Sequence, residues 1–232
     1  MMHGPLLFHI NALVYFLFGD SDTTARLAPA LAGLAVVAMV IPFRRYIGRV
    51  GALAAGILVA FSPSLLFHSR YIRNDIYIAL FALIWIFAAF RYLEAPNKHR
   101  RRWLMIMTLA MAFGFITKEN NFILGALLGA FFVLLALWQV IGANALLAAA
   151  PVLFAAGGAF WLFESGKVAI AALVAVAGVS VAVALLVFWL RGGRWSELRT
   201  NRSADLAVVM LTLVLPFAAP FGHAVFGWDP MA

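Results

Sequence analysis

Long apolar runs separated by short polar breaks set the pattern of this chain. A helix that spans a bilayer needs about 20 mainly apolar residues, and most of the runs are close to that length. They predict an all-α fold, a polytopic transmembrane helical bundle of about 8–9 membrane segments. The predicted segments, of which the first and the fifth are short, are 5–18, 24–43, 50–67, 74–93, 103–117, 121–141, 144–163, 168–190 and 205–225.

Composition narrows the class of protein further. The chain is 66% hydrophobic and 11% charged, whereas soluble domains carry about 25% charged residues. Cysteine is absent, which excludes disulfide frameworks and thiolate metal sites. The net charge of +8 would suit nucleic acid, but basic cytoplasmic loops account for such an excess in a membrane protein. We therefore expect a multi-pass protein of the cell membrane that contacts the bilayer and no nucleic acid.

Lysine and arginine concentrate in alternate breaks, and this bias predicts the orientation of the chain. The breaks that include "FRRYIGR" and "RYLEAPNKHRRRW" carry twelve basic residues: Arg44, Arg45, Arg49, Arg91, Lys98, Arg100, Arg101, Arg102, Arg191, Arg194, Arg199 and Arg202. The breaks that include "FHSRYIRND" and "TKENN" carry five: Arg26, Arg70, Arg73, Lys118 and Lys167. The first set is expected in the cytoplasm, so a site formed by the second set would face the extracytoplasmic side.

The two parts of the chain differ in chemistry. The external breaks within 1–125 carry His, Asn, Asp and Arg, whereas 126–190 is mostly Ala, Leu, Val and Gly. Small residues such as those of "GALLGAFF" suit close packing of membrane helices. We expect 1–125 to be the membrane region that bears the external motifs, and 126–232 to add further transmembrane helices as a scaffold.

The stretch "HSRYIRND" places Arg70, Arg73 and Asp75 beside an apolar run. One explanation is that both arginines snorkel to phospholipid headgroups while Asp75 neutralises one of them. Against it, the arginines are predicted on the side where positive charge is disfavoured. Arginine offers bidentate donors to phosphate oxygens, and a helix that starts near Asn74 would add the positive end of its dipole. The stretch is therefore a candidate phosphate site.

Two further stretches are predicted on the same side. "FITKENNF" puts Lys118 and Glu119 between two spans, either as an ordinary polar turn with a weak ion pair or as a lysine for a lipid-linked phosphate with an acidic neighbour. "HGP" brings His3 to the start of the first helix, where an interfacial histidine without a catalytic role is the commoner case. The histidines show no metal-ligand spacing, so no metal site is predicted.

Several of these stretches together resemble a known family. "HGPLLFHINALVYFLFGDSDTTARLAPALAG", "SRYIRNDIYIALFALIWIFAAFRYLE" and "LAMAFGFITKENNFI" resemble the polytopic glycosyltransferases of the protein O-mannosyltransferase and aminoarabinose-transferase type, which have the GT-C architecture. Within this group, the motifs are most similar to those of the flippase-activity-associated membrane proteins of N-glycosylation. The resemblance covers roughly residues 2–125, in four weak motifs that follow one another in the right order.

This resemblance implies a polyprenyl-phosphate sugar donor, a protein, lipid or glycan acceptor, and inverting transfer. Such enzymes place a catalytic Asp in a loop upstream of the "HGP" element, and only two methionines precede it here, so we expect a fragment whose base lies outside this chain. A divalent metal ion is used by some members and stays open. The expected substrate-binding residues are His3, Arg70, Arg73 and Lys118, with Asp75 and Glu119 as supporting acids.

Two other classes of function remain as alternatives. A lipid-linked sugar flippase or transporter component would also need intramembrane charges, but near the midplane and commonly in repeated halves. Here the charges lie at one predicted face and no repeat is visible. A non-catalytic membrane subunit is the other alternative, favoured by the expected absence of the upstream loop.

Overall fold

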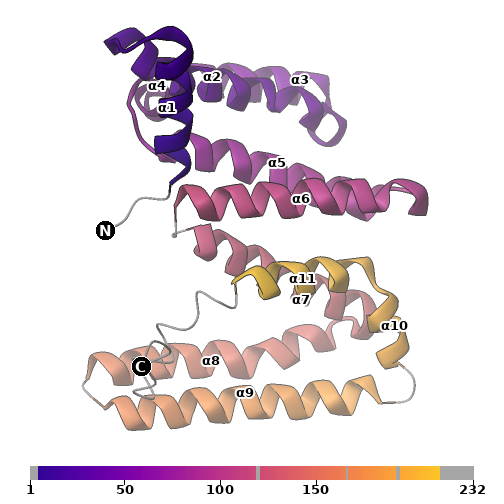
Figure 1. Ribbon diagram of the computed structural model, residues 1–232. Helices are drawn as coiled ribbons and strands as arrows, with labels where there is room; N and C mark the ends of the chain where they lie inside the picture. Colours follow the sequence, from indigo (N-terminus) through magenta and orange to yellow (C-terminus); the bar gives the residue numbers. More distant parts are fainter. Residues whose placement is uncertain (1–4, 119–120, 166, 192–193, 215–232) are drawn as a thin grey trace. The chain divides into compact units, whose positions relative to one another are not determined.

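A computed structural model describes residues 5–118, 121–165, 167–191 and 194–214 of the chain. Every regular element in these residues is a helix, which confirms the predicted all-α fold. The chain divides into two compact units, 1–124 and 125–232, and each is described by itself (Figure 1). The roles predicted for 1–125 and 126–232 stay predictions.

In its described residues, the first unit contains six helices and the start of a seventh. In order along the chain they are α1 (Leu6–Phe18), α2 (Asp22–Ala38), α3 (Val40–Ala60), α4 (Pro63–Arg70), α5 (Asp75–Glu94), α6 (Asn97–Thr117) and α7 (Asn121–Ile141).

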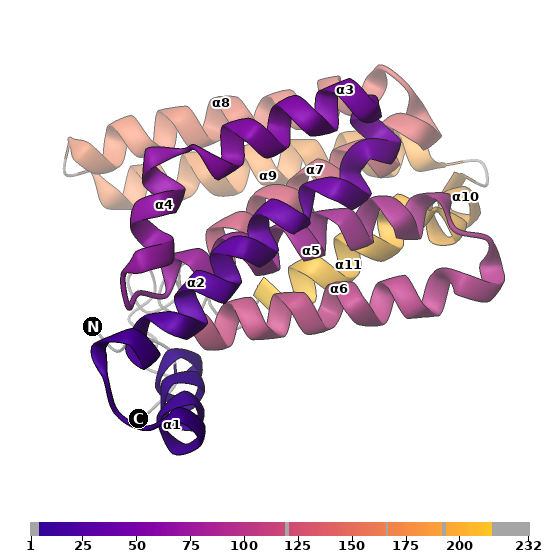
Figure 2. The ribbon, with the colours of Figure 1, turned by 90° about the horizontal axis from the view of Figure 1, so that it is seen from above.

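Local sequence explains where α2 starts and where the chain reverses. Ser21 caps α2 through a capping box with Thr24, which satisfies orphan N–H groups of the first turn. The reversal falls inside α3 at Gly48, whose φ of 74° and ψ of 174° are accessible almost only to glycine. Figure 2 shows the two arms diverging from this turn. The predicted span 50–67 is not one helix, because α3 ends at Ala60 and Pro63 begins α4.

Helices α5 and α6 form an antiparallel pair (Figure 1), and α5 also contributes Ile76 and Tyr77 to an apolar core with α1 and α2. Trp85 of α5 and Met107 and Met111 of α6 are almost completely buried. The short predicted segment 103–117 lies within α6, which already begins at Asn97 in the charged flank. Whether α6 spans the membrane stays a prediction.

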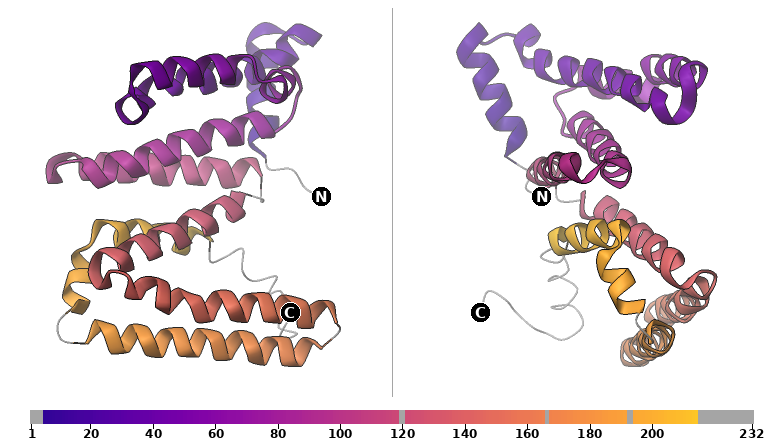
Figure 3. Two further views of the ribbon diagram at one scale, coloured as in Figure 1. Left: turned by 180° about the vertical axis from the view of Figure 1, so that it is seen from behind. Right: turned by 90° about the vertical axis from the view of Figure 1, so that its right-hand side faces the viewer.

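The described part of the second unit contains the rest of α7 and four further helices: α8 (Asn144–Glu164), α9 (Val168–Leu190), α10 (Arg194–Thr200) and α11 (Arg202–Val214). Helices α8 and α9 lie side by side as a hairpin, as both views of Figure 3 show. Gly178 of α9 faces Ala155 and Pro151 of α8 so closely that a side chain there would collide with them. This is the close approach that small residues permit between membrane helices.

Five helical segments in the described residues are long and apolar enough to cross a membrane: Asp22–Ala60, Asp75–Glu94, Asn121–Ile141, Asn144–Leu162 and Ile170–Leu190. Leu6–Phe18 is a shorter apolar helix. The chain is therefore a multi-pass membrane protein. The segment Asp22–Ala60 contains the reversal at Gly48, so it includes the predicted segment 24–43 and the part of 50–67 up to Ala60.

Candidate functional site

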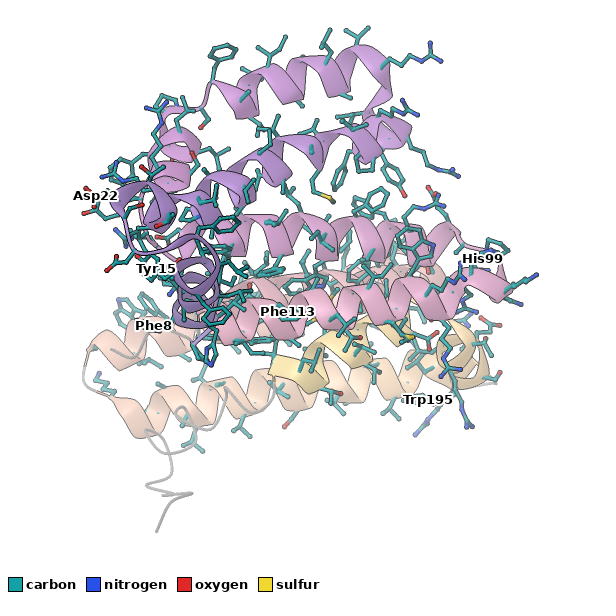
Figure 4. The ribbon with its side chains drawn as sticks, turned by 45° about the horizontal axis from the view of Figure 1, so that its top comes forward. Phe8, Tyr15, Asp22, His99, Phe113 and Trp195 are labelled. Atoms are coloured by element: carbon teal, nitrogen blue, oxygen red, sulfur yellow. The ribbon has the colours of Figure 1, made fainter. Side chains whose placement is uncertain are left out.

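The first unit has two chemically different ends. Figure 4 shows Asp22, at the start of α2, and His99, at the start of α6, at opposite ends of the unit. At the end of the unit that contains His99, Arg45 near the Gly48 reversal pairs with Glu94, the last residue of α5. The breaks that the sequence sorted into two sets thus lie at two ends of this unit. Which end faces the cytoplasm stays a prediction.

Asp75 is the centre of an ion-pair cluster at the end that contains Asp22. Lys118 Nζ lies 3.0 Å from Asp75 Oδ1, and Arg73 Nε lies 3.1 Å from Asp75 Oδ2. His68 Nδ1 is 3.8 Å from the same Oδ2. The side chains of Asp75 and Lys118 are 27% and 26% exposed, so this pair is more shielded from water than a surface salt bridge.

The local sequence explains why these groups meet. Helix α5 begins at Asp75, with Asn74 as the preceding cap residue, so the carboxylate lies at the positive end of the helix dipole, as predicted. The neighbouring helix α6 ends at Thr117 and delivers Lys118 to the same level. The carboxylate at the start of α5 therefore joins the 71–74 connection before it to the end of α6, which lies far along the chain.

A small cavity of about 90 Å³ adjoins the cluster. Its walls include Leu7 of α1 and Ile72, together with Arg73, Asn74, Asp75 and Lys118. Asn74 is 5% exposed, and its Oδ1 has no hydrogen-bond partner among the described residues. Small-molecule sites usually enclose about 300–1,000 Å³, so this cavity suits a small group and not a whole lipid-linked sugar.

Arg70 lies in a different place from Arg73 and Lys118. It lines a wider cavity of about 570 Å³ with Arg26 of α2 and the residues Leu66, Phe67, Tyr71 and Ile72. The rings of Phe67 and Tyr71 stack with centroids 5.4 Å apart. Ile72 lines both cavities, so the two are neighbours at the same end of the unit.

The structure thus brings together Arg73, Asp75 and Lys118 of the predicted site residues, with Arg70 in the adjoining cavity. His3 and Glu119 lie outside the described residues. Sequence reasoning did not single out His68 or Arg26 as site residues. His68 lies within the stretch "HSRYIRND", and Arg26 lies within the first of the three stretches that carry the family resemblance, so their proximity to these motifs was the available signal.

Among the described residues, no group of three or more His, Asp or Glu side chains gathers closely enough to hold a metal ion. The polar groups around Asp75 are mostly cationic, which makes this cluster suited to an anion and not to a cation.

Comparison with known families identifies the chain. The model of the dolichyl-phosphate-mannose-protein mannosyltransferase family matches residues 2–164. The chain belongs to this family. The match to this mannosyltransferase family extends beyond the predicted limit at residue 125 and includes α7 and α8. The chain is therefore a membrane glycosyltransferase domain of the GT-C type. No curated protein and no solved structure matches it. The mannosyltransferase family implies a dolichyl-phosphate-mannose donor and a protein acceptor.

Proposed function

We propose that this chain transfers a sugar from a polyprenyl-phosphate donor to a protein, lipid or glycan acceptor on the extracytoplasmic face. The observation that carries the proposal is the family match over residues 2–164. The cluster around Asp75 supports it, because an anionic donor needs positioned cations. From the motifs in the three stretches that carry the family resemblance, we also propose that the chain is similar to the flippase-activity-associated proteins of N-glycosylation and to aminoarabinose transferases.

The cluster leaves donors available for a phosphate. The Lys118 ammonium has three N–H donors and gives one hydrogen bond to Asp75, and the Arg73 guanidinium has five and meets Asp75 through Nε. Two cations around one carboxylate also leave one unit of positive charge. Asp75 would therefore act as a positioning residue that fixes Arg73 and Lys118, and these two would contact the donor phosphate.

Arg70 would contact the same donor from the wider cavity. That cavity of about 570 Å³ is within the usual range of small-molecule sites. Arg70 and Arg26 supply charge there, while the stacked Phe67 and Tyr71 supply an apolar wall. A phosphate at the boundary of the two cavities would reach donors from both, with Arg26 as an addition to the residues predicted from the sequence.

The remaining roles are proposed from the family resemblance. His3 would line the donor pocket, and Glu119 would orient Lys118 or contact a sugar hydroxyl. In inverting transfer a carboxylate takes the proton of the acceptor hydroxyl while cations stabilise the departing phosphate. Asp75 is not proposed as that base, because both of its oxygens already face cations. The bundle of eight or nine membrane segments belongs to the same proposal.

The test is transfer of a labelled sugar from a polyprenyl-phosphate donor by the protein in lipid vesicles. Arg70→Ala and Lys118→Ala are each expected to lower turnover about tenfold or more, as loss of one donor to a developing anion does. Arg101→Ala is the matched control, because it removes an exposed arginine at the opposite end. Unchanged turnover in both site variants would contradict the assignment.

A non-catalytic membrane subunit is the second candidate function. One observation favours it. Both oxygens of the Asp75 carboxylate already contact cations, Lys118 at 3.0 Å and Arg73 at 3.1 Å, so this carboxylate is not available as a base. A subunit of this kind would bind the donor without turning it over. The same vesicles distinguish the two candidates, because donor binding that depends on Arg70 without any transfer would favour the subunit.

A further inference from the structure

A second, larger groove lies between the two arms of the α2–α3 reversal. It encloses about 610 Å³ and is lined by apolar side chains of both arms. Leu34, Leu53 and Phe61 on its walls are 66%, 67% and 76% exposed. These exposed apolar walls belong to a segment apolar enough to span a membrane, so the groove is suited to hydrocarbon.

Two arginines lie at the closed end of this groove, one on each side of the turn. Arg44 precedes Gly48 and Arg49 follows it, and both line the groove. Their neighbour Arg45 pairs with Glu94 at 3.0 Å. Among the described residues, by contrast, neither Arg44 nor Arg49 lies within salt-bridge distance of a carboxylate.

The distribution of basic residues along the chain predicts that the closed end of the groove lies in the cytoplasmic leaflet of the membrane. Arg44 and Arg49 belong to the set of breaks rich in basic residues. Their neighbour Arg45 pairs with Glu94, the last residue of α5, whereas Asp75 is its first residue, so they lie at the opposite end of that helix from Asp75. Anionic lipids of the cytoplasmic leaflet attract basic groups beside membrane helices, and basic pockets between such helices bind lipid headgroups. A guanidinium also offers paired donors to phosphate oxygens.

We propose that this groove is a binding site for an anionic phospholipid. Arg44 and Arg49 hold its phosphate, and an acyl chain lies between the arms against Leu34, Leu53 and Ile57. Because the two arginines come from opposite arms, one phosphate that contacts both would join the arms across the turn. The proposed phosphate position at Arg44 and Arg49 lies at the other end of the unit from the donor cavities and uses none of their residues, so this inference is independent of the proposed function.

The test is binding of phosphatidylglycerol and phosphatidylcholine to the detergent-purified protein, counted by native mass spectrometry. Phosphatidylglycerol is expected to bind at least about tenfold more tightly than phosphatidylcholine. The double variant Arg44→Gln with Arg49→Gln is expected to remove that preference, because each basic group near an anionic lipid contributes to the binding free energy. Arg101→Gln with Arg102→Gln is the matched control, since it removes the same charge at the same end outside the groove.

Two further measurements test the groove itself. A side chain at Gly56 would meet open space, so Gly56→Phe fills the groove and is expected to lower phosphatidylglycerol binding. In the unaltered protein, a phosphatidylglycerol probe with a photoreactive acyl chain is expected to label residues within 34–61. Equal binding of the two lipids, an equal loss in the control, competition by inorganic phosphate alone, or labelling only outside 34–61 would each overturn the proposal.

Discussion

The ion pair between Asp75 and Lys118 offers the sharpest test of the site. The two side chains join the start of α5 to the end of α6 at an N–O distance of 3.0 Å. A double-mutant cycle with Asp75→Asn, Lys118→Met and the combined variant measures their coupling free energy. Arg45 and Glu94 form a natural control pair in the same unit, also at 3.0 Å.

The expected magnitude follows from exposure. Exposed ion pairs couple by about 0.2–1 kcal/mol, because water and salt screen them. Hydrogen bonds to charged groups that are partly shielded contribute about 1.5–3 kcal/mol. Asp75 and Lys118 are 27% and 26% exposed, whereas Arg45 and Glu94 are 61% and 38% exposed. We therefore expect about 1–2 kcal/mol of coupling for Asp75 with Lys118 and about 0.2–1 kcal/mol for the control pair.

The assay is unfolding of the protein in mixed micelles with increasing denaturing detergent, followed by tryptophan fluorescence. Each cycle yields one coupling free energy, and the two cycles share all other conditions. High salt should lower the control coupling more, because the exposed pair is screened more strongly. A coupling for Asp75 with Lys118 that does not exceed the control would refute the reasoning that this cluster is a shielded, fixed arrangement.

Three further predictions concern the frame around the site. Gly48→Ala should cost about 1–3 kcal/mol of unfolding free energy, because its φ of 74° and ψ of 174° are nearly exclusive to glycine; Gly56→Ala, where the added methyl meets open space, is the control. Gly114→Val should cost about 1–3 kcal/mol by collision with Asn121, and Asn121→Ala should restore part of that loss. Because the chain has no cysteine, Asp22→Cys should react with an impermeant thiol reagent added to sealed cells, whereas His99→Cys should react only after the cells are permeabilised; the reverse pattern, or labelling of both variants in sealed cells, would contradict the orientation.

Periodicity and charge predicted most of the helices, since lipid-facing helices need long apolar runs that are visible in any sequence. The reversal at Gly48 also falls within the predicted break "FRRYIGR". The interruption of 50–67 was missed. Its signal was Pro63, which begins a new helix, but an apolar run on both sides of the proline concealed it.

The partners within the site could be predicted only in part. Arg73 and Asp75 are two positions apart, so their proximity is a local property. Lys118 is forty-three positions from Asp75 along the chain, and only the antiparallel pairing of α5 with α6 brings it there. The separation of Arg70 from Arg73 likewise depends on where α4 ends, at Arg70, which hydropathy does not specify.

The geometry around Asp75 bears on why these charges exist. Arginine and lysine that only anchor a helix at the headgroups need no partner, because each long side chain reaches water by itself. Here one carboxylate holds Arg73 and Lys118 from different elements, and fixing both side chains costs conformational entropy. Anchoring alone does not offset this entropy cost. Binding of a ligand phosphate does offset it, because donors that are already held in place lose less conformational freedom when the phosphate binds. The arrangement therefore favours a preorganised anion site over independent anchors.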